Sequence, residues 1–427
     1  MLDMNIFREN KDIILADHDK RNIPFDDVNE VIRLDKEWRK ARYDSDILRK
    51  ERNQAARSIA VAKKNNDNVK SERILKEVAT IGSEIEKLGI LADNLLEKRD
   101  ALRMKIPNIL HESVPLGEDG QKNTLHSIHG EKMQLDFSAK THNEILEENA
   151  WVDLDRAAKI AGSRFFFLKG DLARLELALQ VYSSNFLIDR GFTLIQPPLM
   201  MNKESYQGVT DLSDFETVMY GIQPDGYYLI ATSEHPLTAM RMKEIIEPSE
   251  LPIKLVGISQ CFRREVGAHG LSDKGLWRVH QFTKVEQVII CQPEESWKMH
   301  EELLNNAIDL WDSLKLHYRV VNICTGDMGT VASKKYDLEA WLPGANEYKE
   351  IVSCSNCTDY QANRLKMRYR TPEGNAAVHT LNSTAVATSR ALVAIMEQYQ
   401  NKDGRVMIPK VLQSLMSNQK YLHPLSK

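Results

Sequence analysis

The segment FRREVGAHGLSDKGLWRVHQFTKVE, from Phe262 to Glu286, crowds opposite charges and an aromatic ring around a glycine-punctuated turn. Alternate side chains of a strand lie on the same face, so Arg263 and Glu265 share one in the first arm. The second arm places five side chains on one face: Arg278, His280, Phe282, Lys284 and Glu286. Three glycines, together with Ser272 and Asp273, lie between the arms. The pattern predicts a strand–loop–strand hairpin.

The charges on this hairpin face need partners, because an unpaired charge in a protein core costs several kcal/mol. A bound ligand would supply them. The planar guanidinium of arginine suits phosphate, the Phe282 ring offers a flat surface for a stacked base, and the Glu286 carboxylate can hold an ammonium group. Phosphate, base and amine together describe ATP and an amino acid. The alternative is a solvent-facing strand with ion pairs, which the alternation alone does not exclude.

The composition is typical of a soluble globular protein. The chain has 427 residues, 42% hydrophobic and 28% charged, which is enough for two or three domains. No apolar run reaches the roughly 18 residues that cross a bilayer. The N-terminal MLDMNIFREN resembles neither a secretion signal nor a transit peptide, and five cysteines without a secretion signal indicate reduced thiols. We therefore expect a cytoplasmic protein with no membrane partner.

A long helical hairpin is predicted near the N-terminus. Apolar residues recur in steps of four and three along residues 74–106, which is typical of a coiled-coil seam. A seven-residue repeat also runs along residues 34–62, weakened at Ser45 and Arg52. The polar KKNNDN between them (63–68) favours a turn, so the two helices should be antiparallel neighbours. About 35 residues per helix give a rod of roughly 50 Å.

Net charge and the pattern of expected strands and helices divide the chain into two parts. Residues 28–106 carry 19 Lys and Arg against 14 Asp and Glu, a net charge of +5, whereas the remainder carries 38 against 47. A basic segment fits a polyanionic partner and, equally, a solvated helix surface. From about residue 115, β-branched and aromatic stretches alternate with turns and a few amphipathic helices, such as 171–187. Without a regular strand–helix–strand alternation, this part predicts an α+β fold in which antiparallel strands dominate.

Six segments resemble, in order, those of one enzyme family. FRRE, the loop and RVHQFTKVE are similar to motif 2 of class II aminoacyl-tRNA synthetases, specifically of seryl-tRNA synthetases. MLDMNIFREN and the paired helices resemble the family's N-terminal tRNA-binding arm. The others are GFTLIQPPLM (191–200), similar to motif 1 at the dimer interface; TSE (232–234), similar to the serine-binding TxE loop; EIVSCSNCTDYQ (350–361); and LNSTAVATSRALVAIMEQYQ (381–400), similar to motif 3.

The resemblance covers nearly the whole chain and implies the following organisation. Residues 1–110 would form the tRNA-binding domain, with its antiparallel coiled coil at about 28–106. Residues 111–427 would form the catalytic domain, an antiparallel β-sheet flanked by helices. The implied enzyme is a homodimeric ligase that activates L-serine with ATP to seryl-adenylate, releases pyrophosphate, and transfers serine to the 3′ end of serine tRNA. Whether selenocysteine tRNA is also charged stays open.

The resemblance also implies which residues bind ATP. Arg263 would hold the α-phosphate and the substrate carboxylate, and Arg390 would clamp the γ-phosphate; these two are the implied catalytic residues. Arg278 would reach the outer phosphates, and Phe282 would stack on adenine. The full implied ATP-binding set is Arg263, Arg264, Glu265, Arg278, Val279, His280, Gln281, Phe282, Glu350, Ile351, Val352, Ser353 and Arg390.

A second implied set binds serine. Glu286 would take the ammonium group, Thr232 and Glu234 would close that pocket, and Asn382 and Thr384 would face the serine side chain. The full set is Thr232, Ser233, Glu234, Arg263, Glu286, Asn382 and Thr384. Thr232 could instead cap a helix that has Glu234 in its first turn. Arg390 could instead be one solvated charge on an amphipathic helix from Ala387 to Tyr399.

The implied metal is Mg²⁺, bound with ATP. Glu350 and Ser353 resemble the family's magnesium-ligating pair, an oxygen-only site that this hard ion prefers. Cys354 and Cys357 form a lone CxxC with no second pair to complete a zinc site, so small packing residues are favoured and no zinc is expected. Neither His269 nor His280 has a partner at a diagnostic spacing, and neither is assigned as a general base.

Two segments depart from the family pattern. Motif 3 reads Asn-Ser-Thr-Ala (382–385), where many bacterial members have Asn-Gly-Ser/Thr-Gly, and is closer to the archaeal and eukaryotic branch. The motif 2 loop (266–275) has Leu271 and Lys274 where basic residues facing the tRNA end are more usual. Two other functions remain: a class II synthetase for a different amino acid, and a catalytically silent paralogue that binds RNA or a partner through its coiled coil. ATP–pyrophosphate exchange with a panel of amino acids distinguishes them.

Overall fold

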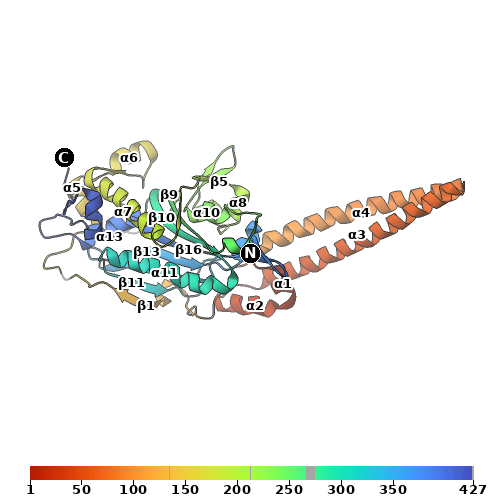
Figure 1. The fold of residues 1–427 in the computed structure, drawn as a ribbon, viewed down its shortest axis with the longest axis horizontal. Helices are drawn as coiled ribbons and strands as arrows, with labels where there is room; N and C mark the ends of the chain where they lie inside the picture. The colour runs from red at the N-terminus through yellow and green to blue at the C-terminus, as the bar shows by residue number, and fades with distance from the viewer. Residues whose placement is uncertain (134, 212, 266–274, 426–427) are drawn as a thin grey trace. The chain divides into compact units, whose positions relative to one another are not determined.

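The structure, a computed structural model, describes residues 1–133, 135–211, 213–265 and 275–425. It divides the chain into two compact units, Leu2–Pro107 and Asn108–Lys427, with Met1 counted in the second (Figure 1). The division falls three residues before the boundary predicted from the sequence. The predicted motif 2 loop, including His269, Leu271 and Lys274, lies almost wholly outside the described residues. No helix within the described ranges is both long and apolar enough to span a membrane.

The N-terminal unit is a helical hairpin with two short helices before it, which confirms the predicted antiparallel arm. Its helices are α1 (Met4–Glu9), α2 (Lys11–Lys20), α3 (Asp26–Lys64) and α4 (Asn68–Arg103). The 39 residues of α3 correspond to about 58 Å. The turn between the long helices is polar, and the Asp67 carboxylate caps α4 by accepting a hydrogen bond from the backbone N–H of Lys70 at 3.0 Å.

The coiled-coil seam is most fully buried in the part of the hairpin nearest to α1. Leu34 and Ala41 of α3 form a buried cluster there with Ala92 and Leu95 of α4. The polar seam residue Arg99 is also buried, with its guanidinium carbon 5.1 Å from the centroid of the Trp38 ring. Arginine fits this position because its stem covers apolar surface while its charge finds a carboxylate partner.

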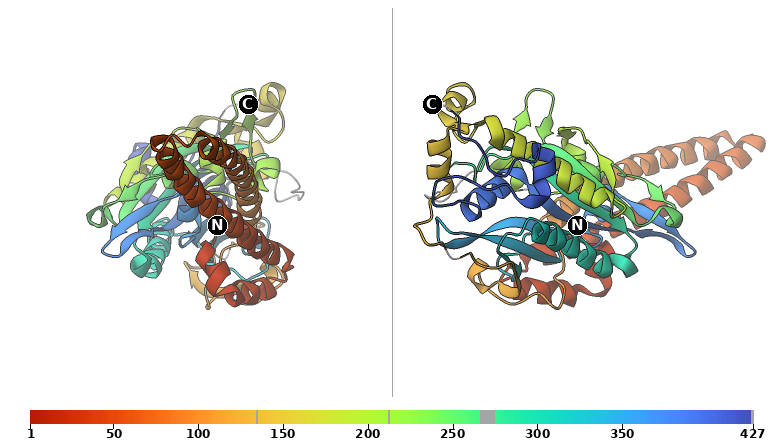
Figure 2. Two further views of the ribbon diagram at one scale, coloured as in Figure 1. Left: turned by 90° about the vertical axis from the view of Figure 1, so that its right-hand side faces the viewer. Right: turned by 60° about the vertical axis from the view of Figure 1, so that its left-hand side comes forward.

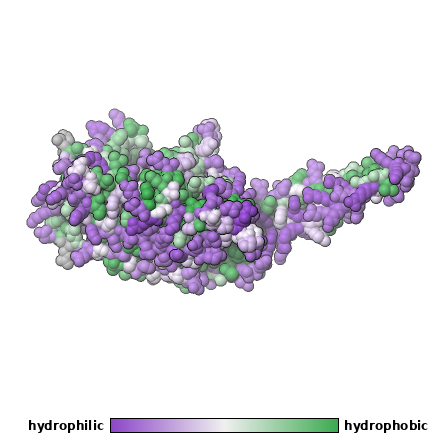
Figure 3. All heavy atoms as spheres, in the orientation of Figure 1, coloured by the Kyte–Doolittle hydropathy of each residue, from purple (hydrophilic) through white to green (hydrophobic). Residues whose placement is uncertain are grey.

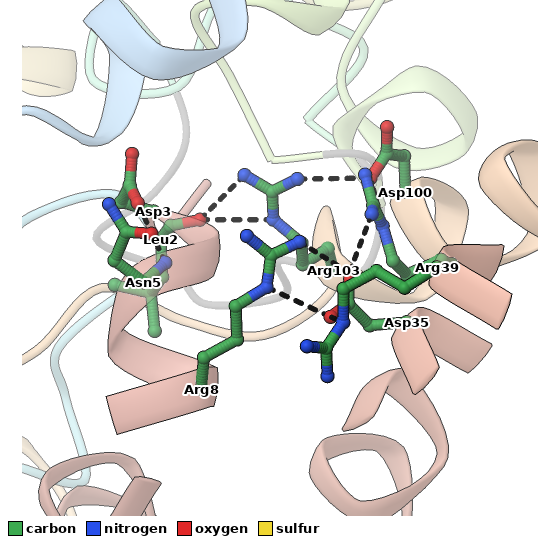
Figure 4. A network of polar contacts seen from close by, with 9 residues as sticks. Leu2, Asp3, Asn5, Arg8, Asp35, Arg39, Asp100 and Arg103 are labelled. Carbon is green, nitrogen blue, oxygen red and sulfur yellow. Dashed lines mark hydrogen bonds and ion pairs between the residues drawn. The ribbon is translucent and has the colours of Figure 1, made fainter. Parts of the chain in front are cut away.

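That partner is Asp35, which is only 2% exposed (Figure 4). Three arginines surround its carboxylate: Arg8 at 2.8 Å, Arg99 at 2.9 Å and Arg39 at 3.1 Å. Beside them, Arg103 donates two hydrogen bonds, of 2.8 and 3.0 Å, to the backbone oxygen of Leu2. The network therefore fastens α1 and the residues before it to both long helices.

The second unit is built on an eight-stranded sheet with the order β1-β11-β12-β13-β16-β10-β9-β4. Among the described residues of this sheet, only the β4–β9 pair is parallel, which confirms the predicted α+β class with a dominantly antiparallel sheet. In sheet order the strands are β1 (Thr124–His129), β11 (Tyr318–Asn322), β12 (Lys334–Leu342), β13 (Glu347–Asn356), β16 (His379–Ala387), β10 (Gln281–Cys291), β9 (Ile253–Phe262) and β4 (Thr193–Ile195).

The central strands have one apolar and one polar face, because alternate side chains point to opposite sides. Val285 of β10, Leu338 of β12 and Ala385 of β16 belong to the main core. Three helices bring their own apolar side chains to that core and lie on one side of the sheet in Figures 1 and 2. They are α7 (Gly170–Ile188), α11 (Ser296–Ser313) and α13 (Thr388–Gln398). The helix predicted for residues 171–187 is thereby confirmed.

Smaller elements complete this unit. The helices are α5 (His142–Asn149), α6 (Leu154–Ala161), α8 (Lys203–Gln207), α9 (Asp214–Thr217), α10 (Glu234–Ala239) and α12 (Tyr360–Leu365). The strands are β2 (Val152–Asp153), β3 (Phe167–Leu168), β5 (Met200–Asn202), β6 (Gly221–Ile222), β7 (Tyr227–Leu229), β8 (Ile245–Ile246), β14 (Arg368–Thr371) and β15 (Gly374–Ala377). Short 3₁₀ turns include Gly120–Lys122, Pro248–Glu250, Pro293–Glu295 and Lys410–Met416.

Candidate active site

A cavity of about 480 Å³ opens on the polar face of the sheet. Strands β10, β12, β13 and β16 form its floor, and the first turn of α10 and the start of α13 form part of its wall. The structure brings together eleven of the side chains predicted to bind ATP, serine or magnesium. They are Thr232, Glu234, Arg263, Phe282, Glu286, Glu350, Ile351, Ser353, Asn382, Thr384 and Arg390.

One end of the cavity holds two carboxylates and one ammonium group. Glu286, which is 1% exposed, forms an ion pair of 2.5 Å with Lys284 of the same strand. Glu234 lies close by and accepts a hydrogen bond from Gln361 at 3.2 Å. Burial and the neighbouring Glu286 raise the pKa of Glu234 to about 7, against the opposing effect of Lys284. This end therefore has an excess of negative charge and attracts a further cation.

Residues around the two carboxylates hold them in place. The backbone N–H of Glu234 donates to the Thr232 hydroxyl at 3.2 Å, so Thr232 supports the start of α10 as well as lining the cavity. His235 also lines the cavity, and its Nδ1 lies 2.9 Å from the Tyr206 hydroxyl. Burial, with Lys284 and Arg263 nearby, lowers the pKa of His235 to about 3, which keeps this imidazole neutral.

The middle of the cavity combines an aromatic ring with a guanidinium. Phe282 of β10 is buried to 9% exposure, and the Arg263 guanidinium carbon lies 5.4 Å from its ring centroid. The Arg263 Nε also donates to the backbone oxygen of Ala231 at 3.3 Å. An arginine beside an aromatic face can bind an anionic group while the ring receives a planar one.

The other end holds Arg390 and Glu350. Arg390 donates to the Glu350 backbone oxygen at 2.9 Å and to its carboxylate at 3.1 Å. The side chain of Glu350 is exposed, and the positive charges of Arg390 and Lys335 lower its pKa to about 2, so this carboxylate is ionised at neutral pH. Arg390 thus lies in the first turn of α13 and lines the cavity, which favours the binding interpretation over that of a solvated helix charge.

Eight predicted site residues do not line this cavity: Arg264, Glu265, Arg278, Val279, His280, Gln281, Val352 and Ser233. The reason for five of them, 264, 265 and 278–280, is that the hairpin strands are shorter than predicted. Strand β9 ends at Phe262 and β10 begins at Gln281, which are paired directly. Beyond this pair, Glu265 has a φ of +48°, so strand alternation no longer determines where side chains point.

These eight residues have other surroundings. Arg278 forms an ion pair of 3.2 Å with Glu265, and the His280 Nδ1 lies 2.8 Å from the Tyr220 hydroxyl. Gln281 lines a smaller cavity of about 190 Å³, to which Phe282 also contributes. Val279 and Val352 are packed in the core, the Ser233 hydroxyl is hydrogen-bonded to the backbone, and Arg264 is exposed.

Sequence reasoning gave no role to several residues that the fold brings to this site. Lys284 was placed on the correct face, but its pairing with Glu286 was not predicted. Lys335 of β12 lines the cavity and lies 3.3 Å from the Asp337 carboxylate. The available signal was weak: polar residues alternate with apolar ones in β12, but their neighbours come from other strands.

The CxxC cysteines are both buried, in accordance with the packing interpretation. Cys357 contributes to the cavity wall, and the Asn382 amide lies 3.7 Å from its sulfur. Across the residues that the structure describes, no group of three or more His, Cys, Asp or Glu side chains is arranged to hold a metal ion. A cation here would need oxygen ligands from other sources, such as hydroxyl groups, water or phosphate.

Comparison with known proteins identifies the family. Residues 220–399 match the tRNA synthetase class II core domain (G, H, P, S and T), and residues 1–110 match the seryl-tRNA synthetase N-terminal domain. The serine–tRNA ligase of Methanocella arvoryzae is 49% identical over 427 residues, covering 99% of this chain and 100% of the relative. That of Methanocorpusculum labreanum is 51% identical over 434 residues, with the same coverage. The chain belongs to the seryl-tRNA synthetases.

Solved seryl-tRNA synthetase structures support this assignment. The Pyrococcus horikoshii enzyme complexed with ATP is 41% identical, with a TM-score of 0.93 and full coverage of both chains. The cytoplasmic serine–tRNA ligase of Naegleria fowleri in complex with AMP is 36% identical, with a TM-score of 0.88, covering 100% of this chain and 99% of that one. The class II fold and the seryl-tRNA synthetase resemblance predicted from the sequence are confirmed.

Proposed function

We propose that the 480 Å³ cavity activates L-serine with ATP and then transfers the seryl group to serine tRNA. The observation that carries this proposal is the set of groups that one cavity brings together. The Glu234–Glu286 end suits an ammonium group, Phe282 with Arg263 suits adenine and the α-phosphate, and Arg390 suits the outer phosphates. Serine and ATP together present the complementary groups, which are an ammonium group, a planar base and phosphates.

The serine end is built to recognise a small hydroxylated amino acid. In the proposed complex, the ammonium group binds Glu286, while Asn382 and Thr384 face the hydroxyl from the neighbouring strand β16. These polar side chains are almost fully buried. Alanine would leave them without partners, and an unpaired buried polar group is costly, so the site should reject it.

In the proposed reaction, the serine carboxylate attacks the α-phosphorus of ATP, an oxygen–phosphorus bond forms, and pyrophosphate leaves. A terminal ribose hydroxyl of the tRNA then attacks the seryl carbonyl, and AMP leaves. Arg263 holds the reacting carboxylate and the α-phosphate together. Arg390 gives up its hydrogen bond to the Glu350 carboxylate and binds the outer phosphates instead. Catalysis rests on positioning and charge neutralisation, without a covalent enzyme intermediate.

The residues at the Arg390 end fit Mg²⁺. The Glu350 carboxylate is ionised and the Ser353 hydroxyl lies on the same strand, so both offer the oxygen ligands that this ion prefers. The remaining ligands would be phosphate oxygens and water. When bound with ATP, the cation neutralises charge on the phosphates.

The N-terminal arm is proposed to bind tRNA, with residues 1–110 as the tRNA-binding domain and 111–427 as the catalytic domain. Exposed basic side chains extend along α3, among them Lys50, Arg57 and Lys64. Their contacts with phosphates should make the affinity fall steeply with salt. Five buried cysteines with free thiols fit a reducing compartment, and we place the enzyme in the cytoplasm.

The enzyme is further proposed to be a homodimer. Exposed apolar side chains lie along one face of α7 and continue into the motif 1 segment: Leu177, Val181, Ile188, Leu194, Leu199 and Met200. Figure 3 shows apolar side chains gathered over the region where Figure 1 draws α7. A continuous apolar face of this kind is typical of an interface, and a second copy of the chain is the occupant that we propose.

A single substitution distinguishes amino-acid activation from tRNA binding. Arg263→Ala should abolish serine-dependent ATP–pyrophosphate exchange, because Arg263 is the cation at the centre of the cavity. It should leave filter binding of serine tRNA nearly unchanged. Arg370→Ala, which removes an exposed arginine from β14, serves as the control and should leave both unchanged. Equal loss of exchange and tRNA binding in Arg263→Ala would contradict the role given to Arg263.

A further inference from the structure

Asp337 of β12 is a buried carboxylate that has no role in the proposed serine activation. It is 5% exposed. Lys335 lies 3.3 Å from its Oδ2, whereas Oδ1 has no hydrogen-bond partner among the described residues. A buried carboxylate oxygen without a partner is costly, and such groups are uncommon in folded proteins. The oxygen therefore calls for an explanation.

Strand pairing places Asp337 next to the proposed magnesium ligands. Asp337 is paired directly with Ser353 of β13 in the sheet register, and cross-strand partners point to the same face. The Ser353 side chain is therefore a direct neighbour of the Asp337 carboxylate, whose Oδ1 is free to accept a hydrogen bond. Lys335, on the same face of β12, lines the cavity together with Ser353.

A hydroxyl group that binds a cation needs a hydrogen-bond acceptor for its own proton. A serine hydroxyl has one O–H to donate and two lone pairs. When its oxygen faces a cation, its proton must point away from the cation, toward an acceptor. Asp337 offers that acceptor from the neighbouring strand. Groups that orient metal ligands in this way commonly affect metal affinity as strongly as the ligands do.

We propose that Asp337 is a positioning residue for the divalent cation that accompanies ATP, acting through the Ser353 hydroxyl. Its carboxylate accepts a hydrogen bond from the Ser353 hydroxyl, which turns the oxygen lone pairs toward the cation, and its negative charge adds to that of Glu350. Lys335 balances part of the charge while the site is empty. This inference rests on the proposed magnesium site at Glu350 and Ser353.

The chain offers a matched pair of variants. Asp337→Asn and Lys335→Met each break the same ion pair, but only the first removes the carboxylate, with its negative charge and one of its two acceptor oxygens. The readout is the Kd of Mn²⁺, followed by the electron paramagnetic resonance signal of the free ion, at a saturating concentration of a non-hydrolysable ATP analogue. Asp337→Asn should raise this Kd about ten- to a hundredfold. Lys335→Met should leave it unchanged or lower it.

Equal weakening in both variants would show that only the ion pair matters and would overturn the inference, as would an unchanged Kd in Asp337→Asn. If Asp337→Asn alone folds poorly, Lys335→Met/Asp337→Asn is compared with Lys335→Met, since neither leaves an unpaired buried lysine. The same loss of Mn²⁺ affinity is expected there. Absence of nucleotide-dependent Mn²⁺ binding in the unmodified enzyme would instead refute the magnesium site itself, and the inference with it.

A double-mutant cycle tests the route through Ser353. If Asp337 acts by orienting the hydroxyl, Asp337→Asn should have little further effect on the Mn²⁺ Kd in a Ser353→Ala background. Additive losses would contradict this route.

Discussion

Glu286→Gln is the substitution on which the proposed serine site depends most. The side chains of Glu286 and Lys284 are 1% and 7% exposed and lie 2.5 Å apart. Removing one partner of a buried ion pair typically costs about 3–5 kcal/mol, because it leaves the other charge buried alone. We therefore expect the free energy of unfolding to fall by about 3 kcal/mol. A lost charge-assisted hydrogen bond to the serine ammonium costs about 1.5–3 kcal/mol, so the KM for serine should rise roughly ten- to a hundredfold.

The double variant Lys284→Met/Glu286→Gln separates these two effects. It removes both charges, so most of the lost stability should return in chemical denaturation experiments. The net charge of the pocket is also restored, with Glu234 still present. Serine-dependent ATP–pyrophosphate exchange should nevertheless stay defective at unchanged KM for ATP, because the negative charge that pairs with the serine ammonium is missing. Recovery of serine activation in the double variant would refute the role of Glu286 and show that charge balance alone is required.

Three further predictions concern other parts of the molecule. Burial and Glu286 raise the pKa of Glu234 to about 7, so protonation below that pH removes negative charge that attracts the serine ammonium. The KM for serine in exchange assays should therefore rise when the pH is lowered from 8 to 6. Glu234→Gln should flatten this pH profile. Leu177→Glu on α7 should convert dimer to monomer in light scattering, whereas Ile128→Glu on β1, at a similarly exposed site, should not. Asp35→Asn should destabilise the N-terminal unit by about 3 kcal/mol in thermal unfolding, because three arginines lose their shared carboxylate, and an unchanged transition would contradict this.

The features that the sequence predicted well are those with a local period. The arm follows from its heptad repeat, and even the polar seam residue Arg99 lies in the predicted position. Phe282 and Glu286 face the cavity because the alternation of a strand continues without interruption from one to the other. In both cases the backbone geometry alone relates neighbouring residues, so one sequence is sufficient.

The prediction failed where the chain leaves regular structure or where distant strands meet. Arg278 and His280 lie before β10, so the period of two does not extend to them. The pairing of Asp337 with Ser353 depends on the register between β12 and β13, which is determined by packing across the whole sheet. Nearly all of the motif 2 loop (266–275) lies outside the described residues, so what its sequence predicts stays a prediction.

The most direct test of the central claim is ATP–pyrophosphate exchange by the purified enzyme with serine, threonine, alanine and glycine supplied one at a time. The proposed site predicts exchange that depends on serine, with alanine and glycine rejected because Asn382 and Thr384 would lose their partner. Exchange that is stimulated best by another amino acid, or by none, would contradict the assignment of this cavity to serine activation.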